Sequence, residues 1–225
     1  MKRLFGKLSP FEAGLLTASL LAITVSFFVA GSGEYLYLAA SYVGAVALIF
    51  VAKGNVLGQI LTVVFSILYG VISFSYRYYG EMITYLGMTM PIAAATVVAW
   101  LRHPYHGTAE VQVNQLKKRE YGIIFLLSLP VTALFFCILR ALGTANLAVS
   151  TLSVFTSFVA VVLTLRRSAF YALAYAANDL VLIVLWILAS IQNPAYVSMV
   201  ACFAAFLVND SYGFFHWQRM KKSQR

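Results

Sequence analysis

Residues 170–191, FYALAYAANDLVLIVLWILASI, form an uninterrupted apolar run in which Asp179 is the only charged side chain. A helix that crosses a hydrocarbon core of roughly 30 Å needs about 20 such residues. The apolar character is continuous rather than alternating, which favours a helix over a strand of a membrane β-barrel. The stretch therefore predicts a transmembrane helix that buries one polar pair, Asn178-Asp179.

Seven further apolar runs of similar length surround this one along the chain. The eight predicted spans are Phe11–Ala30, Tyr35–Ala52, Val56–Tyr76, Met82–Leu101, Tyr121–Leu139, Ala148–Leu165, Phe170–Ile191 and Tyr196–Trp217. The chain is 62% hydrophobic and 10% charged, whereas soluble domains carry about 25% charged residues. The predicted fold class is an all-α polytopic membrane protein with about eight transmembrane helices, which excludes a soluble enzyme.

The basic residues are distributed unequally between the two sides of these spans. Fourteen of the sixteen fall on the side that carries both termini: Lys2, Arg3, Lys7, Lys53, Arg102, Lys117, Lys118, Arg119, Arg166, Arg167, Arg219, Lys221, Lys222 and Arg225. Arg77 and Arg140 fall on the other side. The positive-inside rule then predicts a multi-pass protein of the cell membrane with both termini in the cytoplasm. The same rule explains the net charge of +9 without a nucleic-acid partner.

The first apolar run follows three basic residues, so a cleaved signal peptide is the alternative to a span. Its apolar stretch is about twice the length of a usual signal-peptide core, and no clear cleavage site closes it. We therefore expect residues 1–34 to contain a cytoplasmic segment and a retained first membrane helix.

A weak internal similarity divides the rest of the chain. Two triplets of spans, residues 35–101 and 148–217, match at an offset of roughly 114–117 residues and end in Trp100 and Trp217. Residues 102–147 hold a loop and one linking span, and 218–225 form a basic tail. Because four spans separate equivalent helices, the triplets have the same orientation. This pattern predicts a 3+1+3 parallel repeat, an organisation found in transporters.

The third span carries a stripe of polar residues along one helical face. The stripe consists of Gln59, Thr62, Ser66, Tyr69 and Ser73, at spacings of three and four. Such side chains either line a pathway or hydrogen bond neighbouring helices together. We expect Thr62 and Ser73 to hold helices together, while both interpretations stay open for Gln59, Ser66 and Tyr69.

The last two spans contain matching polar pairs, Asn178-Asp179 and Asn209-Asp210. Each pair lies about 12 Å from the end that carries the basic residues, at 1.5 Å per residue. An ionised Asp near the bilayer centre costs about 2.5–3.5 kcal/mol, so two of them need a reason. Pairing with Arg166, Arg167 or Arg219 is one explanation, but we favour a shared hydrophilic cavity.

Aromatic side chains accompany these pairs on the same helical faces. One face holds Tyr171, Tyr175, Asn178, Leu182 and Trp186, and the other holds Asn209, Tyr212 and His216. Aromatic rings stack on flat heterocycles, amides bind hydroxyl or carboxamide groups, and carboxylates with π faces favour a cation. The faces predict a site for a flat cationic solute. We expect His216, Trp100 and Trp217 to lie in interfacial aromatic belts.

Other features add smaller expectations. Pro91 and Pro130 interrupt two spans, which predicts kinks or hinges. Glu81 begins the fourth span, where a capping role is favoured over an entry site for a cation. His103 and His106 in the long loop have no further His or Cys nearby, so no metal or other cofactor is expected. The chain has no nucleotide-binding or hydrolase motif, which argues against an ATP-driven pump.

Several short motifs resemble the Pnu-type family of vitamin transporters, over roughly residues 35–222. They are Ala52-Lys53-Gly54-Asn55, Ile67-Leu68-Tyr69-Gly70, Tyr79-Gly80-Glu81-Met82, Ala99-Trp100 and Gly213 to Trp217 followed by Lys221-Lys222. The resemblance implies a core like that of a full-length SWEET transporter, a homotrimer, and facilitated diffusion of a vitamin that a separate cytoplasmic kinase traps by phosphorylation. Family members often place Trp where this chain has Tyr171 and Tyr175, which leaves the preferred ring open.

From the residues and the resemblance together we expect a membrane carrier for nicotinamide riboside. The predicted substrate-binding residues are Asn178, Asp179, Tyr175, Tyr171, Trp186, Asn209, Asp210, Tyr212, Gln59, Ser66 and Tyr69. One alternative is a carrier of the same fold for thiamine, riboflavin or a deoxynucleoside. Another is a membrane assembly subunit that transports nothing and whose polar groups only join helices.

Overall fold

The computed structural model describes residues 8–31, 35–75 and 78–224. Its elements are α1 (Pro10–Ala30), α2 (Tyr35–Ala52), α3 (Val56–Ser75), α4 (Tyr79–Thr84), the π-helix η1 (Tyr85–Thr89), α5 (Met90–Leu101), α6 (Lys118–Ala141), α7 (Leu147–Leu165), α8 (Tyr171–Gln192), the 3-10 turn η2 (Pro194–Tyr196) and α9 (Val197–Ser223). Within this part of the chain, eight helical segments are long and apolar enough to cross a membrane. The eight-span, all-helical prediction is confirmed.

Most predicted boundaries agree with the structure to within three residues. The largest difference is at α9, which continues past Trp217 to Ser223 because the residues that follow are good helix formers that can extend into water. Some predictions concern residues outside the described part of the chain. These residues are Lys2, Arg3, Lys7, Arg77 and Arg225, the link at 32–34, and Tyr76 at the predicted end of the third span.

Local sequence explains how the first helix begins and ends. Ser9 and Glu12 form a reciprocal capping box, with Pro10 at the first helical position, and these side chains satisfy amides that the helix itself leaves unpaired. Gly31 ends the helix in the left-handed conformation, at φ 60°. The first span is therefore a fully formed helix with its own capping signals.

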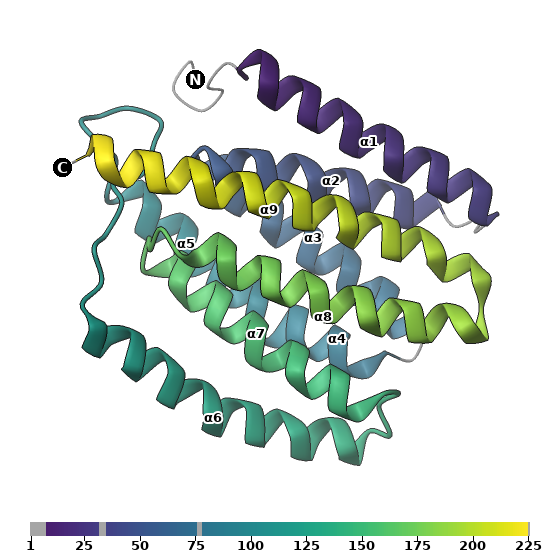
Figure 1. Cartoon of the computed structure of the whole chain (residues 1–225). Helices are drawn as coiled ribbons and strands as arrows, with labels where there is room; N and C mark the ends of the chain where they lie inside the picture. Colours follow the sequence, from purple (N-terminus) through teal and green to yellow (C-terminus); the bar gives the residue numbers. More distant parts are fainter. Residues whose placement is uncertain (1–7, 32–34, 76–77, 225) are drawn as a thin grey trace.

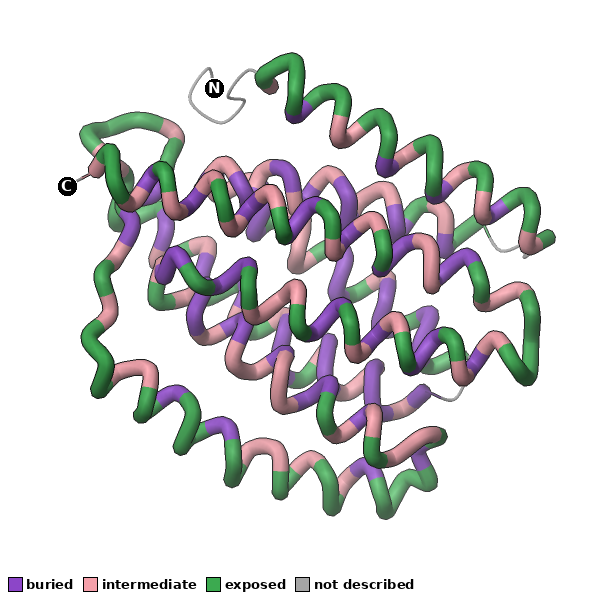
Figure 2. The backbone as a smooth tube through the Cα atoms, viewed as in Figure 1, coloured by how far each residue is buried: buried purple, intermediate pink, exposed green. Residues whose placement is uncertain are grey.

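Six helices form a closed cycle of neighbours around the interior. Each of α2, α3, α5, α7, α8 and α9 packs against the next, and α9 packs back against α2. The other two spans lie outside this ring: α1 packs on α2 and α9, and α6 packs on α7 (Figure 1). Figure 2 shows that α1 and α6 are largely exposed, whereas burial concentrates among the other helices. We call the closed cycle of α2, α3, α5, α7, α8 and α9 the ring.

The chain begins and ends at the same end of the bundle. In Figure 1, α1 begins and α9 ends on the same side, together with the long loop between α5 and α6. An even number of spans requires this arrangement. We call this the basic end, because the described residues of the predicted basic side, including Lys53, Arg102, Arg166 and Lys222, belong to its turns and helix termini.

Two tryptophans lie inside the basic end rather than in a lipid-facing belt. Trp100 is 2% and Trp217 is 0% exposed, and their ring centroids are 5.5 Å apart. The Trp100 indole donates to the Thr164 carbonyl at 3.2 Å, and the Trp217 indole donates to the Val51 carbonyl at 3.0 Å. The belt prediction for both is wrong, since each indole N–H has a buried carbonyl partner and each ring packs against its counterpart.

The turns that follow these two carbonyls are alike. Gly54 has φ 64° and donates its amide to the Val51 carbonyl, and Arg167 has φ 57° and donates to the Thr164 carbonyl. The loop between α5 and α6 joins both turns. Val111 donates its amide to the Gly54 carbonyl and Asn114 donates to the Arg167 carbonyl, each at 2.9 Å. The loop thus fastens the two halves of the ring at the basic end.

The predicted irregularity at Pro91 takes the form of a π-helix. The Met90 amide donates to the Tyr85 carbonyl five residues earlier, and Pro91 follows directly. Proline has no N–H, so the regular ladder is interrupted there and the preceding turn widens. By contrast, α6 runs as one helix through Pro130.

Candidate substrate cavity

A small cavity lies inside the ring, closer to the basic end than to the opposite end. Its volume is about 50 Å³. It is lined by Gly44, Ala47, Leu48 and Val51 of α2, Gln59, Thr62 and Phe65 of α3, Tyr85 and Thr89 of η1, Tyr175, Asn178 and Asp179 of α8, and Phe203, Phe206 and Asp210 of α9. We call it the central cavity. Its walls come from both triplets of spans.

The charged groups of the central cavity are two carboxyls. Asp179 and Asp210 are each 3% exposed and are close neighbours in the cavity wall. Two carboxyls buried next to each other can share one proton. None of the lining residues, all of which belong to the described part of the chain, is Lys, Arg or His. A negative charge on this pair would therefore have no cationic side chain among the cavity walls.

Pairing of these carboxyls with arginine was the alternative explanation. Over the described ranges, the ion pairs are Lys53 with Glu12 and Arg166 with Glu120, and neither involves Asp179 or Asp210. Both aspartates line one cavity instead, as the cavity explanation predicted.

Asn178 is held in a fixed orientation by the neighbouring helix α7. Its side-chain oxygen accepts hydrogen bonds from the Thr156 hydroxyl at 2.8 Å and the Ser157 hydroxyl at 2.9 Å. With the oxygen occupied twice, the amide nitrogen is the group left to donate to a cavity occupant. The residue is 2% exposed, so a polar partner would bind it away from bulk water.

The π-helix supplies two lining residues that the sequence analysis missed, Tyr85 and Thr89. Within the described chain the Thr89 hydroxyl is buried without a hydrogen-bond partner. Pro91 was the available signal, because π-helices occur frequently at functional sites. Phe65, Phe203 and Phe206 were also missed, since a phenylalanine in an apolar span carries no pattern that separates cavity walls from lipid-facing positions.

Five of the predicted site residues come together in the central cavity: Gln59, Tyr175, Asn178, Asp179 and Asp210. Thr62 lines it as well, although it was expected only to join helices; its hydroxyl donates to the Gly58 carbonyl within its own helix. Gln59 and Thr62 on α3 have the same three-residue spacing as Tyr175 and Asn178 on α8. Each triplet thus contributes a pair with this spacing to one cavity, although the residue types differ.

Six predicted site residues lie outside the cavity walls. Tyr171 packs on Trp217 with ring centroids 4.7 Å apart, and the Trp186 indole donates to the Tyr69 hydroxyl at 3.0 Å. Ser66 donates to the Thr62 carbonyl within α3. Asn209 and Tyr212 on α9 donate to Ser19 and Glu12 on α1, respectively. These six side chains therefore do not line the central cavity. Each helix touches several neighbours along its length, so residues on one face meet different helices at different depths.

Ser73 and Glu81 lie in the half of the bundle opposite the basic end. Ser73 is buried, and its hydroxyl has no partner among the described residues. Glu81 is 0% exposed, and one of its oxygens accepts from the Ser153 hydroxyl at 2.9 Å. Glu81 lies in the first turn of α4, where an acidic side chain was predicted. The hydrogen bond with Ser153 also joins α4 to α7.

Aromatic clusters close the central cavity toward both ends. On the basic side lie Trp100, Tyr171 and Trp217. On the other side lie Tyr69, Trp186 and other buried rings. A volume of about 50 Å³ holds a few waters, whereas ligand pockets measure about 300–1,000 Å³. The described conformation is therefore closed, and a nucleoside-sized solute requires the helices to separate.

An eight-span bundle with two buried carboxyl groups in a cavity between two groups of helices defines a membrane transporter for a small polar solute. The chain belongs to the nicotinamide mononucleotide transporter family, whose model matches residues 34–219.

Individual relatives agree with this membership. The nicotinamide riboside transporter PnuC of Neisseria mucosa is 26% identical over 98% of this chain and 86% of its own length. The nicotinamide riboside transporter PnuC of Haemophilus influenzae is 22% identical over 95% of this chain and 92% of its own length. A crystal structure of the vitamin B3 transporter PnuC superposes with a TM-score of 0.87 at 25% identity, covering 100% of this chain and 97% of that one. These relatives are transporters and not enzymes.

Proposed function

We propose that this protein carries nicotinamide riboside across the cell membrane through the central cavity, by facilitated diffusion. The observation that carries the proposal is the Asp179–Asp210 pair in a cavity lined by no cationic side chain. Relatives named as nicotinamide riboside transporters support the choice of solute.

The chemistry of the cavity matches the parts of this solute. Nicotinamide riboside has a pyridinium cation, a carboxamide and a ribose. The Asp pair supplies the counter-charge, and the rings of Phe65 and Tyr175 offer π faces to the cation. Asn178 and Gln59 supply the amide groups that a carboxamide and sugar hydroxyls need.

The same chemistry ranks the alternatives. A nucleotide would place a phosphate dianion beside two carboxyls with no cation in the walls, so the nucleoside is favoured over the mononucleotide. Riboflavin and deoxynucleosides lack the positive charge that the Asp pair favours, whereas thiamine carries one and remains the main alternative. A non-transporting assembly subunit is disfavoured because the relatives are transporters.

We propose that Gln59, Tyr175, Asn178, Asp179 and Asp210 contact the substrate, together with Thr62, Tyr85 and Thr89. The remaining predicted residues, Tyr171, Trp186, Asn209, Tyr212, Ser66 and Tyr69, support the walls from behind through the bonds and ring contacts given above.

The transport cycle that we propose moves the two triplets of helices against each other. Two features support a 3+1+3 parallel repeat with a SWEET-like core: the matching indole bonds of Trp100 and Trp217, and the matching turns at Gly54 and Arg167. Residues 102–147 then form the connection between repeats, and residues 1–34 and 218–225 flank the core. Alternating access would open the aromatic clusters on either side of the cavity in turn.

The basic end faces the cytoplasm in this proposal, by the positive-inside rule. A cysteine label at position 110 should then react only from the cytoplasmic side, and one at position 33 only from outside. A homotrimer and a cytoplasmic kinase that traps the vitamin are parts of the proposal that rest on the family resemblance.

The deciding experiment is uptake of labelled nicotinamide riboside into vesicles that contain the purified protein and no kinase, with the membrane potential held at zero. We expect equilibration without accumulation, and competition by unlabelled nicotinamide riboside but not by riboflavin, a deoxynucleoside or nicotinamide mononucleotide. Stronger competition by thiamine would change the assigned substrate. Accumulation above the external concentration would overturn facilitated diffusion.

A further inference from the structure

A second and larger cavity lies outside the ring, between α1 and α9. It is a groove of about 820 Å³ whose walls are Leu8, Ser9, Phe11, Glu12 and Leu15 around α1, Lys53 after α2, and Val208, Ser211, Tyr212, Phe215, His216 and Arg219 of α9. It shares no lining residue with the central cavity. We call it the α1–α9 groove.

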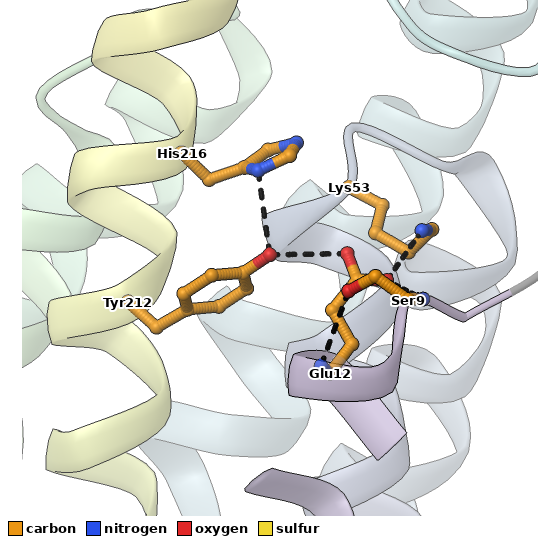
Figure 3. A network of polar contacts seen from close by, with 5 residues as sticks. All are labelled: Ser9, Glu12, Lys53, Tyr212 and His216. Atoms are coloured by element: carbon orange, nitrogen blue, oxygen red, sulfur yellow. Dashed lines mark hydrogen bonds and ion pairs between the residues drawn. The ribbon is translucent and has the colours of Figure 1, made fainter. Parts of the chain in front are cut away.

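A polar network connects five of the residues that line this groove (Figure 3). One Glu12 oxygen accepts from the Lys53 ammonium group at 2.7 Å and from the Ser9 amide at 2.6 Å. The other accepts from the Tyr212 hydroxyl at 3.1 Å, and this hydroxyl lies 3.4 Å from Nδ1 of His216. Glu12 is only 2% exposed. The carboxylate is thus covered by its partners and presents almost no charge to an occupant.

The charge that the groove does present is positive. The Lys53 side chain is 18% exposed, and Arg219 is exposed. Over the described residues Arg219 has no carboxylate partner. Two cations against one buried carboxylate leave a net positive charge, and the His216 ring stands beside it. An anion would therefore meet Lys53 and Arg219 first.

The groove combines cationic side chains at the basic end with apolar walls. His216 and Arg219 lie nearest the basic end, and Val208 lies about 16 Å deeper along the helix, at 1.5 Å per residue. Val208 forms the deeper wall, whereas Phe11 and Phe215 lie nearer the basic end, and all three are exposed apolar side chains on the outside of the bundle. A soluble anion would gain nothing from such walls, whereas a molecule with an anionic head and an apolar chain would match both parts.

We propose that the α1–α9 groove binds an anionic glycerophospholipid. Its phosphate contacts Arg219 and Lys53 at the basic end, and an acyl chain lies along Phe11, Val208 and Phe215. Basic pockets between transmembrane helices on the cytoplasmic side bind such headgroups in other membrane proteins. The lipid would fill the space between the outer helix α1 and the ring, and so fasten α1 without entering the transport path.

Native mass spectrometry of the purified protein, given equal amounts of phosphatidylglycerol and phosphatidylcholine and no transport substrate, tests the proposal. We expect preferential retention of phosphatidylglycerol. Arg219→Gln should reduce that retention about fivefold, the effect of one basic side chain, and should leave phosphatidylcholine unchanged. Lys222→Gln is the matched control, because Lys222 is an exposed cation on the same helix that does not line the groove.

A second variant separates a lipid from a soluble anion. Val208→Trp fills the apolar part of the groove and keeps all cations, so it should lower retention of phosphatidylglycerol. Equal retention of the two lipids, or equal behaviour of Arg219→Gln and Lys222→Gln, would overturn the proposal. So would displacement of the lipid by sn-glycerol 3-phosphate at equal concentration, because that molecule has the headgroup chemistry without the chains.

Discussion

The central cavity and the α1–α9 groove both contain buried carboxyl groups, but only the carboxyl group in the groove has a cationic partner. In the groove, Glu12 has Lys53 as a partner and its remaining acceptor positions are filled by Ser9 and Tyr212. In the cavity, Asp179 and Asp210 have each other and no cationic side chain in the walls.

This difference distinguishes Glu12, which has a structural role, from the Asp179–Asp210 pair, which we propose binds a ligand. A buried charge is tolerated when it is paired and hydrogen bonded. Glu12 meets that condition within the folded chain, so it needs nothing further. The aspartate pair meets it only in part, and a cationic solute would complete it. Mutations should therefore act on binding in the cavity and on stability in the groove.

The largest effect should follow from removing the charge of the cavity altogether. The double variant Asp179→Asn/Asp210→Asn should weaken nicotinamide riboside binding about 10- to 150-fold, since an interaction with a charged group contributes about 1.5–3 kcal/mol. Calorimetry on protein that elutes like the parent measures this. The uncharged dihydro form of the nucleoside is the control ligand and should lose much less. Equal losses for both ligands would contradict a charge-selective cavity.

A single replacement should reveal which aspartate carries the shared proton. An asparagine at the protonated position keeps the net negative charge, so that variant should bind almost like the parent. The other single variant should behave like the double one. Two equally weak single variants would show that both carboxyls are charged when the substrate binds.

Asn178→Ala should weaken binding by about 1–3 kcal/mol, or about 5- to 150-fold, because it leaves a polar group of the substrate unpaired in a site without water. The structural alternative is that Asn178 serves only Thr156 and Ser157. That alternative predicts poor assembly with unchanged affinity. Thr156→Val is the matched control, since it removes one of those bonds and leaves the amide in place.

Glu12→Gln should lower stability and leave substrate affinity unchanged. The change removes a charge partner from Lys53 in a nearly buried network, which we expect to cost about 1–3 kcal/mol and to lower the melting temperature by several degrees. Glu120→Gln is the control, because the Glu120–Arg166 pair is exposed and its loss should change the melting temperature little. A loss of substrate affinity in Glu12→Gln would link the two regions.

The smallest effect that we expect concerns the aromatic wall. Tyr175→Ala should weaken binding by about 0.5–2 kcal/mol, the range of a cation–π contact, while Tyr175→Trp should be tolerated or should change the preferred ring. Tyr171→Phe is the comparison, since Tyr171 packs behind the cavity on Trp217. Unchanged affinity in a well-folded Tyr175→Ala protein would remove this ring from the site.

The sequence alone determined the eight spans, their order and the concentration of basic residues at one end. Hydropathy is a local property, and about 20 apolar residues in a row have one stable arrangement in a bilayer, a helix that satisfies its own backbone. The sequence also identified five residues of the cavity. Asn178, Asp179 and Asp210 stood out because an Asn-Asp pair inside an apolar helix is costly. Gln59 and Tyr175 stood out because each shares a helical face with other polar or aromatic side chains.

Tertiary structure alone decided which side chains meet. Helical spacing gives the angle between two residues on one helix but not the neighbour that each one faces. Asn209 and Asp210 are consecutive, yet one bonds to α1 and the other lines the cavity. The sequence positions of Trp100 and Trp217 are typical of belt residues, but in the structure the two rings are buried against each other. The π-helix that brings Tyr85 and Thr89 to the cavity, and the pairing of Glu12 with Lys53, depend on packing between segments far apart in the chain, which no local pattern records.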